Sequence, residues 1–252
     1  MKILIVSDIH SNYPALQAIW EKEKDSDVVL IPGDLVDWGF FPHECVTWAR
    51  EHDAIIVAGN HDHEVLDAYD SGVRYPTDGT SCTFHQYTIG QLTEPDLNYL
   101  RSLPESRYFK LDGQSFFMKH YPHCHVNIEC PLTDEICKFD TIAYADREWL
   151  LGTGQEPDHF DKRVLLFGHY HECQIRLLGC GYTWIDPGAV AYRLGPNAQA
   201  KSATYVTVED GLPSAHSVSY PMDVFEPYLR DVPFAEDSIY KKLSRIFFTP
   251  QT

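Results

Sequence analysis

Cysteine pairs and long apolar runs are both missing from this 252-residue sequence. Its 7 cysteines include no C-x-x-C pair and are odd in number, so we expect free thiols in a reducing cytoplasm rather than a disulfide framework. A loose group at Cys124, Cys130 and Cys137 lacks the paired spacing of a zinc site. No run of about 18 apolar residues occurs, so no membrane span is expected. The first apolar run, 3–6, is too short for a secretion signal.

Positive charge is also scarce. The chain has 20 Lys and Arg against 37 Asp and Glu, a net charge of −17. This excess repels the phosphate backbone of nucleic acids and anionic lipid surfaces, so neither general nucleic-acid binding nor membrane binding is expected. Hydrophobic residues make up 44% of the chain, enough to bury a sizeable core. We expect one main domain over 1–220 and a C-terminal extension, 221–252, that packs on the same domain or forms an oligomer contact.

The first third of the chain alternates strand and helix patterns. Short β-branched or apolar runs indicate buried strands, and apolar residues at helical spacing indicate the helices between them. This order is typical of a largely parallel α/β sheet with crossover helices. The expected strands are 2–6, 28–31 and 54–58, and the expected helices are 14–24 and 43–51.

The remaining two thirds are expected to be richer in β-structure. Residues 70–88 have the composition of a long loop, 93–103 that of a capped helix, and 127–141 are ambiguous. Two runs joined at Asp112-Gly113 predict a β-hairpin over 108–111 and 115–119. A helical tail is expected at 237–248. The later strand candidates are 163–167, 174–178, 182–185, 203–208 and 215–220.

Polar side chains capable of binding metal follow each predicted strand of the first third. Because ligands bind outside the carboxyl ends of parallel strands, these side chains are expected to meet at one edge. Residues two apart in extended backbone point the same way, so a pair such as Asp8 and His10 can reach one ion. Carboxylate, imidazole and amide oxygen together favour Mn, Fe, Zn or Co over Mg or Ca. The strand-end residues are Asp8, His10, Asp34, Asp37, Asn60, His61, His120, His169 and His171.

Each of these residues has an ordinary explanation when taken alone. An Asp after a strand is usually a helix cap or a turn former, and a single His is usually a surface or core group. The ordered series, however, resembles the motifs of the calcineurin-like metallophosphoesterases. The motifs that carry the resemblance are Asp8-x-His10, Gly33-Asp34-x-x-Asp37, Gly59-Asn60-His61-Asp62, His120 and Gly168-His169-x-His171, followed by Pro187-Gly188-Ala189.

The resemblance implies a four-layer αββα sandwich with two mixed β-sheets and a pair of divalent or trivalent transition-metal ions. We expect Mn first, with Fe, Zn, Ni or Co as alternatives. One metal would be held by Asp8, His10, Asp34 and His171. The other would be held by Asp34, Asn60, His120 and His169, with Asp34 bridging the two. His61 would be the catalytic histidine and Asp37 the acid that orients it.

The implied function is hydrolysis of a small or nucleotide-like phosphodiester or phosphomonoester by a metal-activated water. Protein phosphatases of this family carry Arg and Glu where this chain has Trp38 and Asp62, so the pattern is more similar to the compact prokaryotic phosphodiesterase-like group. Two alternatives stay open. One is a DNA-repair-type nuclease, which the acidic charge disfavours. The other is a non-catalytic scaffold, which the complete ligand set disfavours.

Overall fold

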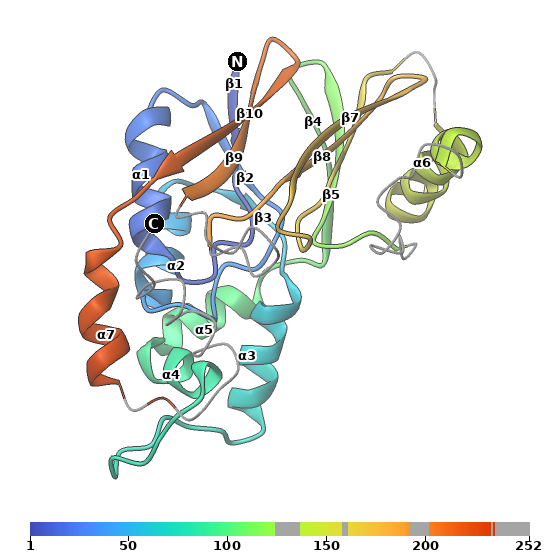
Figure 1. The fold of residues 1–252 in the computed structure, drawn as a ribbon. Coiled ribbons are helices and arrows are strands. Elements are labelled where there is room, and N and C mark those ends of the chain that lie inside the picture. Colours follow the sequence, from blue (N-terminus) through green and yellow to red (C-terminus); the bar gives the residue numbers. More distant parts are fainter. Residues whose placement is uncertain (124–136, 158–160, 192–201, 233, 235–252) are drawn as a thin grey trace.

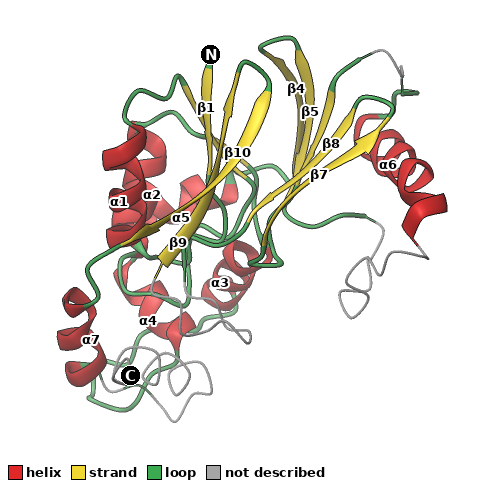
Figure 2. Cartoon of the chain, turned by 45° about the horizontal axis from the view of Figure 1, so that its top comes forward, coloured by secondary structure: helices red, strands yellow, loops and turns green. Residues whose placement is uncertain are grey.

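The structure is a computed structural model that describes residues 1–123, 137–157, 161–191, 202–232 and 234. The chain builds two five-stranded sheets. Figure 1 shows the sheets beside each other, with helices on the outer side of each, and Figure 2 shows the strands of both sheets in yellow from a second direction. The expectation of a four-layer αββα sandwich with two mixed sheets is confirmed.

The first sheet has the strand order β10-β9-β1-β2-β3. β1, β2 and β3 are parallel neighbours, whereas β9 runs antiparallel to β1 and β10 antiparallel to β9. The carboxyl ends of the parallel strands therefore share one edge of this sheet. The strands are β1 (Lys2–Ile5), β2 (Val28–Ile31), β3 (Ile55–Ile56), β9 (Ser202–Glu209) and β10 (Leu212–Ser219).

The second sheet repeats this plan with the order β4-β5-β6-β8-β7. β5, β6 and β8 are parallel, and the edge strands β4 and β7 are antiparallel to their neighbours. Each sheet thus has three adjacent parallel strands whose carboxyl ends can carry a site. The strands are β4 (Ser106–Leu111), β5 (Gln114–Lys119), β6 (Arg163–Leu166), β7 (Cys173–Gly179) and β8 (Tyr182–Pro187).

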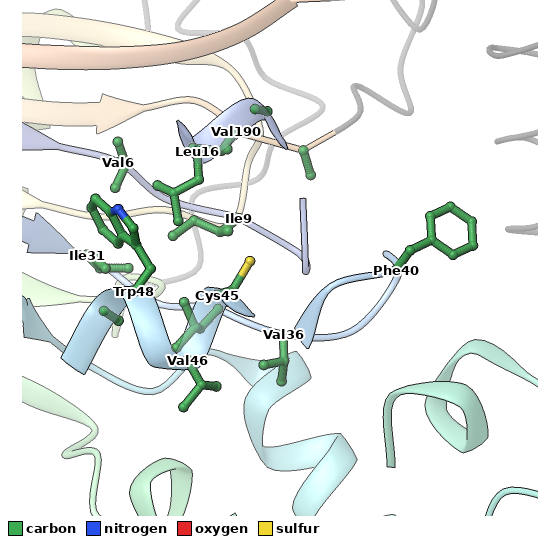
Figure 3. Close-up of a cluster of buried hydrophobic side chains, with 14 of the residues drawn as sticks. Val6, Ile9, Leu16, Ile31, Val36, Phe40, Cys45, Val46, Trp48 and Val190 are labelled. Carbon is green, nitrogen blue, oxygen red and sulfur yellow. The ribbon is translucent and has the colours of Figure 1, made fainter. Parts of the chain in front are cut away.

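Alternation along β1 shows how the layers are held together. Ile3 and Ile5 belong to a cluster between the sheets, whereas Leu4 and Val6 belong to the cluster under the outer helices. Successive side chains of a strand point to opposite faces, so a strand buried on both faces has a continuous apolar sequence. Figure 3 shows part of the outer cluster, with Val6 and Leu16 among its labelled residues.

Helices cover the outer face of each sheet. Those in contact with the outer cluster of the first sheet include α4, whose Phe84 and Tyr87 are buried there. The second sheet is covered by α6, whose Ala145 and Trp149 pack on Phe117 and Leu165. The helices are α1 (Tyr13–Glu23), α2 (Pro42–Glu51), α3 (Asn60–Asp70), α4 (Phe84–Gln91), α5 (Glu94–Arg101), α6 (Cys137–Thr153), the 3₁₀ helix η1 (Asp223–Phe225) and α7 (Glu226–Asp231).

Most of the predicted elements are confirmed. The hairpin turns at Asp112-Gly113, where φ is 48° and 74° as a two-residue turn requires. The loop predicted over 70–88 is wrong at its end, because α4 begins at Phe84. A capping box starts this helix: Gln86 donates its backbone N–H to Thr83 Oγ1, and Gln86 Oε1 accepts from the Thr83 N–H.

The C-terminal part of the described chain continues onto the first sheet's outer cluster. Phe225 and Leu229, from η1 and α7, are buried in it. The predicted tail, 237–248, and Cys124 and Cys130 lie outside the described residues, so the division at residue 220 stays a prediction. Among the residues that the structure does describe, no helix has both the length and the apolar character needed to cross a membrane.

Candidate metal centre

The predicted ligands from both sheets lie in one cluster. They follow the carboxyl ends of β1, β2, β5 and β6, or begin α3 after β3. Many of them have left-handed backbone, which side chains other than glycine rarely adopt. Such strain costs about 1–3 kcal/mol per residue and collects at functional sites. The residues concerned, with φ between 44° and 74°, are Asp8, His10, Asp34, Asp37, His169 and His171.

Asp34 lies at the middle of the cluster and is almost fully buried. Its Oδ1 accepts a hydrogen bond from the backbone N–H of His61 at 2.9 Å. Its Oδ2 lies 3.1 Å from His120 Nε2 and 3.6 Å from His10 Nε2. One carboxylate oxygen therefore faces an imidazole from each sheet. A Cβ on Gly59 would lie 2.0 Å from Asp34 Oδ1, so only glycine fits there.

His120 crosses from the second sheet to the first. Its Nδ1 donates to the Pro32 carbonyl at 2.8 Å, which fixes the tautomer and leaves Nε2 to face the site. Nε2 lies 3.1 Å from both Asp34 Oδ2 and Asn60 Oδ1. Burial lowers the pKa of His120, but the charges of Asp34 and Asp8 outweigh burial and raise it to about 10.

Asp8, His10 and His171 form the other side of the cluster. His171 Nε2 lies 3.2 Å from Asp8 Oδ1 and 3.2 Å from His10 Nε2. Burial lowers the pKa of His10 to about 3, so the ring is neutral at neutral pH and can offer a lone pair. Its other nitrogen, Nδ1, is buried with no hydrogen-bond partner among the described residues.

Asn60 and His169 complete the ligand set predicted from the sequence. Asn60 Oδ1 lies 3.1 Å from His169 Nδ1, the same distance as from His120 Nε2. The backbone N–H of His169 points at Asp8, with both carboxylate oxygens 3.1 Å away. All seven predicted ligands are therefore brought together.

The donor set fits divalent transition metals. Imidazole nitrogens, carboxylates and an amide oxygen lie within hydrogen-bonding distance of one another, and each can offer a lone pair to a cation once it is deprotonated. A cation between such atoms satisfies all of them at once. Within the described residues, three groups have the spacing of a metal site: Asp8–His10–His171, His10–Asp34–His61 and Asp8–Asp34–His120.

His61 and Asp37 form a buried pair beside this cluster. His61 Nδ1 lies 2.9 Å from Asp37 Oδ2, and Asp37 is fully buried. Burial opposes ionisation of Asp37, but contacts with His61 and His85 hold its pKa down at about 2. For His61, burial lowers the pKa, yet the bond to Asp37 and the charge of Asp34 raise it above its ordinary value.

Trp38 stands at the position where the protein phosphatases of the family are expected to have Arg. Its indole stacks on His10, with ring centroids 5.0 Å apart and planes at 17°. It also meets His61 edge-on at 4.0 Å. An apolar ring, rather than a guanidinium, therefore covers this side of the site.

Asp62 holds the two loops from β2 and β3 together. Its Oδ1 accepts from the backbone N–H groups of Leu35 and Val36 at 3.0 and 3.1 Å, and its Oδ2 accepts from Gly59 at 2.8 Å. Burial and the nearby Asp34 raise the pKa of Asp62 to about 6. Both oxygens of Asp62 are therefore bonded to loop backbone, so this carboxylate stabilises the loops and does not face the cluster of ligands.

Two residues at the site were not predicted from the sequence. His85 Nδ1 lies 2.9 Å from Asp37 Oδ2, and His85 Nε2 lies 3.6 Å from Glu64 Oε2. The contact with Asp37 raises the pKa of His85. Neither residue follows a strand, so the pattern that indicated the ligands gives no signal for them.

The comparisons with known proteins give the family. The calcineurin-like phosphoesterase model matches residues 1–197, and the chain therefore belongs to this family. Its members are generally phosphoester hydrolases that use divalent metals. An uncharacterized protein of Methanocaldococcus jannaschii is 41% identical over 130 residues, which are 50% of this chain and 51% of that protein. The chain thus spans about half the length of the curated relative it matches.

Solved structures share the fold. A metallophosphoesterase from Sphaerobacter thermophilus has a TM-score of 0.65 at 22% identity, covering 98% of this chain and 100% of that chain. A hypothetical protein from Pyrococcus horikoshii has a TM-score of 0.69 at 17% identity, covering 100% of this chain and 99% of that one. At these identities, the likeness shows the architecture alone.

Proposed function

We propose that this protein is a dinuclear metal-dependent phosphoesterase acting on small phosphodiesters or phosphomonoesters. The observation that carries the proposal is the position of Asp34, whose Oδ2 faces His10 on one side and His120 on the other. A carboxylate between two sets of donors is the arrangement that a pair of cations requires. The donor types favour Mn, Fe, Zn, Ni or Co, and Mn²⁺ is our first choice.

The seven ligands would divide between two ions. Asp8, His10 and His171 would hold one, Asn60, His120 and His169 the other, and Asp34 would bridge them. When bound, such a pair lowers the pKa of a coordinated water and neutralises charge that develops on the phosphoryl oxygens. The Pro32 carbonyl, by fixing the tautomer of His120, keeps its Nε2 free for this task.

His61 is placed to assist the leaving group. Its Nδ1 is engaged by Asp37, so its Nε2 is the nitrogen that can give a proton to the departing oxygen. Asp37 would accept the Nδ1 proton, orient the ring and stabilise the doubly protonated, charged form, which gives up its Nε2 proton and is left as the neutral Nδ1–H form. Burial of both side chains keeps water from competing for these contacts.

The wall formed by Trp38 favours a diester with an organic group on each side of phosphorus. The indole offers a flat apolar surface next to His61, where the leaving group would lie. On the opposite side, Tyr121 is 38% exposed and lies 5.7 Å from His169, ring to ring. We therefore expect aromatic or nucleoside-like esters to be better substrates than phosphoproteins.

The test is hydrolysis of bis-p-nitrophenyl phosphate and p-nitrophenyl phosphate by metal-stripped protein, with and without Mn²⁺. We expect Mn²⁺-dependent turnover with a preference for the diester. Asp34→Asn should lose at least about 10³-fold in kcat/KM, since it removes the shared charge. Metal content measured alongside should fall from two ions per chain in the wild type.

A matched control is Asp53→Asn. Asp53 has the same left-handed backbone as Asp34, with φ of 46° against 53°, but it is exposed in a turn away from the site. Its substitution should leave turnover unchanged. A wild type that binds two ions yet hydrolyses neither ester with Mn, Fe, Zn, Ni or Co would contradict the proposal and favour a non-catalytic binding protein.

A further inference from the structure

His85 contacts the candidate site from a helix that carries none of the strand-end motifs. It belongs to α4, which is anchored by the capping box at Thr83 and by Phe84 and Tyr87 in the outer cluster. Thr88, one helical turn away, is also buried, with its Oγ1 3.5 Å from Asp37 Oδ1. The helix is therefore held firmly, and this fixes where the imidazole of His85 can lie.

One carboxylate oxygen of Asp37 contacts the imidazoles of both His61 and His85. Asp37 Oδ2 lies 2.9 Å from His61 Nδ1 and also 2.9 Å from His85 Nδ1. The His85 nitrogen is buried and lies off the line of an ideal hydrogen bond, so this is a close polar contact in which Nδ1–H faces the carboxylate. A fully buried carboxylate needs such partners, because its charge has no water to solvate it.

The other nitrogen of His85 is held as well. His85 Nε2 lies 3.6 Å from Glu64 Oε2, which is also 3.6 Å from His61 Nδ1. The second oxygen of Glu64 accepts from Asn60 Nδ2 at 3.4 Å. His85 thus lies between two carboxylates, Asp37 and Glu64. Asp37 contacts His61, the proposed proton donor, and Glu64 contacts Asn60, a proposed metal ligand. Its side chain is 35% exposed, against 9% for His61, so it forms the outer end of the group.

We infer that His85 is a positioning residue: it holds the same Asp37 oxygen that contacts His61, so that the His61 ring keeps one orientation and its Nδ1 keeps its proton. This rests on the proposed function, in which His61 protonates the leaving group. With His85 absent, Asp37 Oδ2 would keep His61 as its partner and Oδ1 would keep the weak contact with Thr88, so the carboxylate would be held less firmly. His61 would then be aligned during a smaller fraction of turnovers, and esters whose leaving group needs a proton would lose most.

The test compares His85→Ala with the wild type on aryl phosphodiesters whose leaving groups range from p-nitrophenolate to phenolate, at saturating Mn²⁺. We expect kcat to fall about 10- to 100-fold on the phenyl ester, part of the contribution of a general acid. The loss should be several-fold smaller on the p-nitrophenyl ester, with KM unchanged on both. A loss of equal size on all esters would show a merely structural role and overturn the inference.

Two further variants sharpen the result. His85→Asn keeps an N–H donor at the position of Nδ1 and should restore most of the lost kcat. In a His61→Ala background, His85→Ala should cost nothing more, because it acts through His61. Additive losses, or no rescue by Asn, would contradict the inference. The matched control is His43→Ala. It breaks a similar contact elsewhere in the protein, in which His43 Nδ1 lies 2.8 Å from Oδ2 of the buried Asp96.

A readout without turnover separates this inference from the proposed function. Long-range ¹H–¹⁵N spectra of the metal-free protein report the tautomer of each histidine. At a pH above the pKa of His61, where the ring is neutral, we expect a single Nδ1–H form for His61 in the wild type, His85→Asn and His43→Ala, and a mixture of tautomers in His85→Ala. If the wild type hydrolyses no ester, the proposed function fails, but the spectra still decide the role of His85: an unchanged His61 signal in His85→Ala would overturn it.

Discussion

The two sheets contribute different chemistry to one site. The loops of the first sheet provide the predicted carboxylates, Asp8, Asp34 and Asp37, all buried and bonded to backbone or side-chain donors. The predicted ligands that follow β5 and β6 of the second sheet are all imidazoles, those of His120, His169 and His171. The negative charge is therefore concentrated on one side, and the other side supplies ligands that are neutral when they bind. The comparison suggests that affinity for a cation depends mainly on the first sheet, and that the second sheet shapes the coordination.

The largest expected effect is on metal affinity, where a carboxylate ligand from the first sheet is compared with an imidazole ligand from the second. Asp8→Asn removes a full charge, whereas His171→Asn removes a neutral ligand. At about 4 Å and an effective dielectric constant of about 20, a unit charge is worth roughly 4 kcal/mol, or about 10³-fold in affinity. We expect Mn²⁺ affinity to fall about that much in Asp8→Asn and distinctly less in His171→Asn. Isothermal titration calorimetry with Mn²⁺ measures both, and equal losses would break the comparison.

The next largest effect is a difference in stability between variants of two ligands from the second sheet, His120 and His169. His120 is buried and donates to the Pro32 carbonyl after β2, so it links the sheets, while His169 is exposed. His120→Ala removes the closer of the two donors to that carbonyl, leaving Ser7 Oγ at 3.4 Å, and should lower the free energy of unfolding by about 1–3 kcal/mol in metal-free protein. His169→Ala should change it by no more than about 0.5 kcal/mol. Urea denaturation tests this, and similar values for both variants would contradict the role given to His120.

The smallest effect concerns the first sheet's buried pair and its dependence on pH. The pKa of Asp37 is held at about 2 in the folded protein, below its ordinary value, so its charge stabilises the fold above pH 4 and loses this effect as pH falls toward 2. The metal-free wild type should exceed Asp37→Asn in unfolding free energy by about 2 kcal/mol at pH 5, and by about 1 kcal/mol at pH 3. Denaturation at these two pH values gives the difference, and a gap that widens on acidification would refute it.

Much of this arrangement could be predicted from the sequence because the signals are local. Each buried strand is a short apolar run, and the polar residue that follows it is adjacent in the chain, so strand order alone brings Asp8, Asp34 and Asn60 together. The hairpin at Asp112-Gly113 is likewise encoded by two neighbouring residues. The four-layer architecture came from the family resemblance, since no local pattern states how two sheets pack.

What escaped prediction depends on contacts between distant segments. His85 meets Asp37 only because α4 docks through Phe84 and Tyr87, and a short helix with several aromatic residues has the composition of a loop. The helix that begins at Asn60 was not among the predicted helices. Its first residues are held by the carboxylates of Asp34 and Asp62, which lie outside the local pattern of apolar residues.

The layer between the sheets has a mechanical consequence. Because Asp34 follows a strand of one sheet and His120 a strand of the other, their spacing is set by the aliphatic side chains that keep the sheets apart, such as Ile5, Leu30 and Met118. A sliding of one sheet over the other by a fraction of an ångström would change all the distances that join the two sheets, such as Asp34 to His120 and Asp8 to His171. Substitutions in this remote layer can therefore shift the ligands of one sheet relative to those of the other without a change in any ligand.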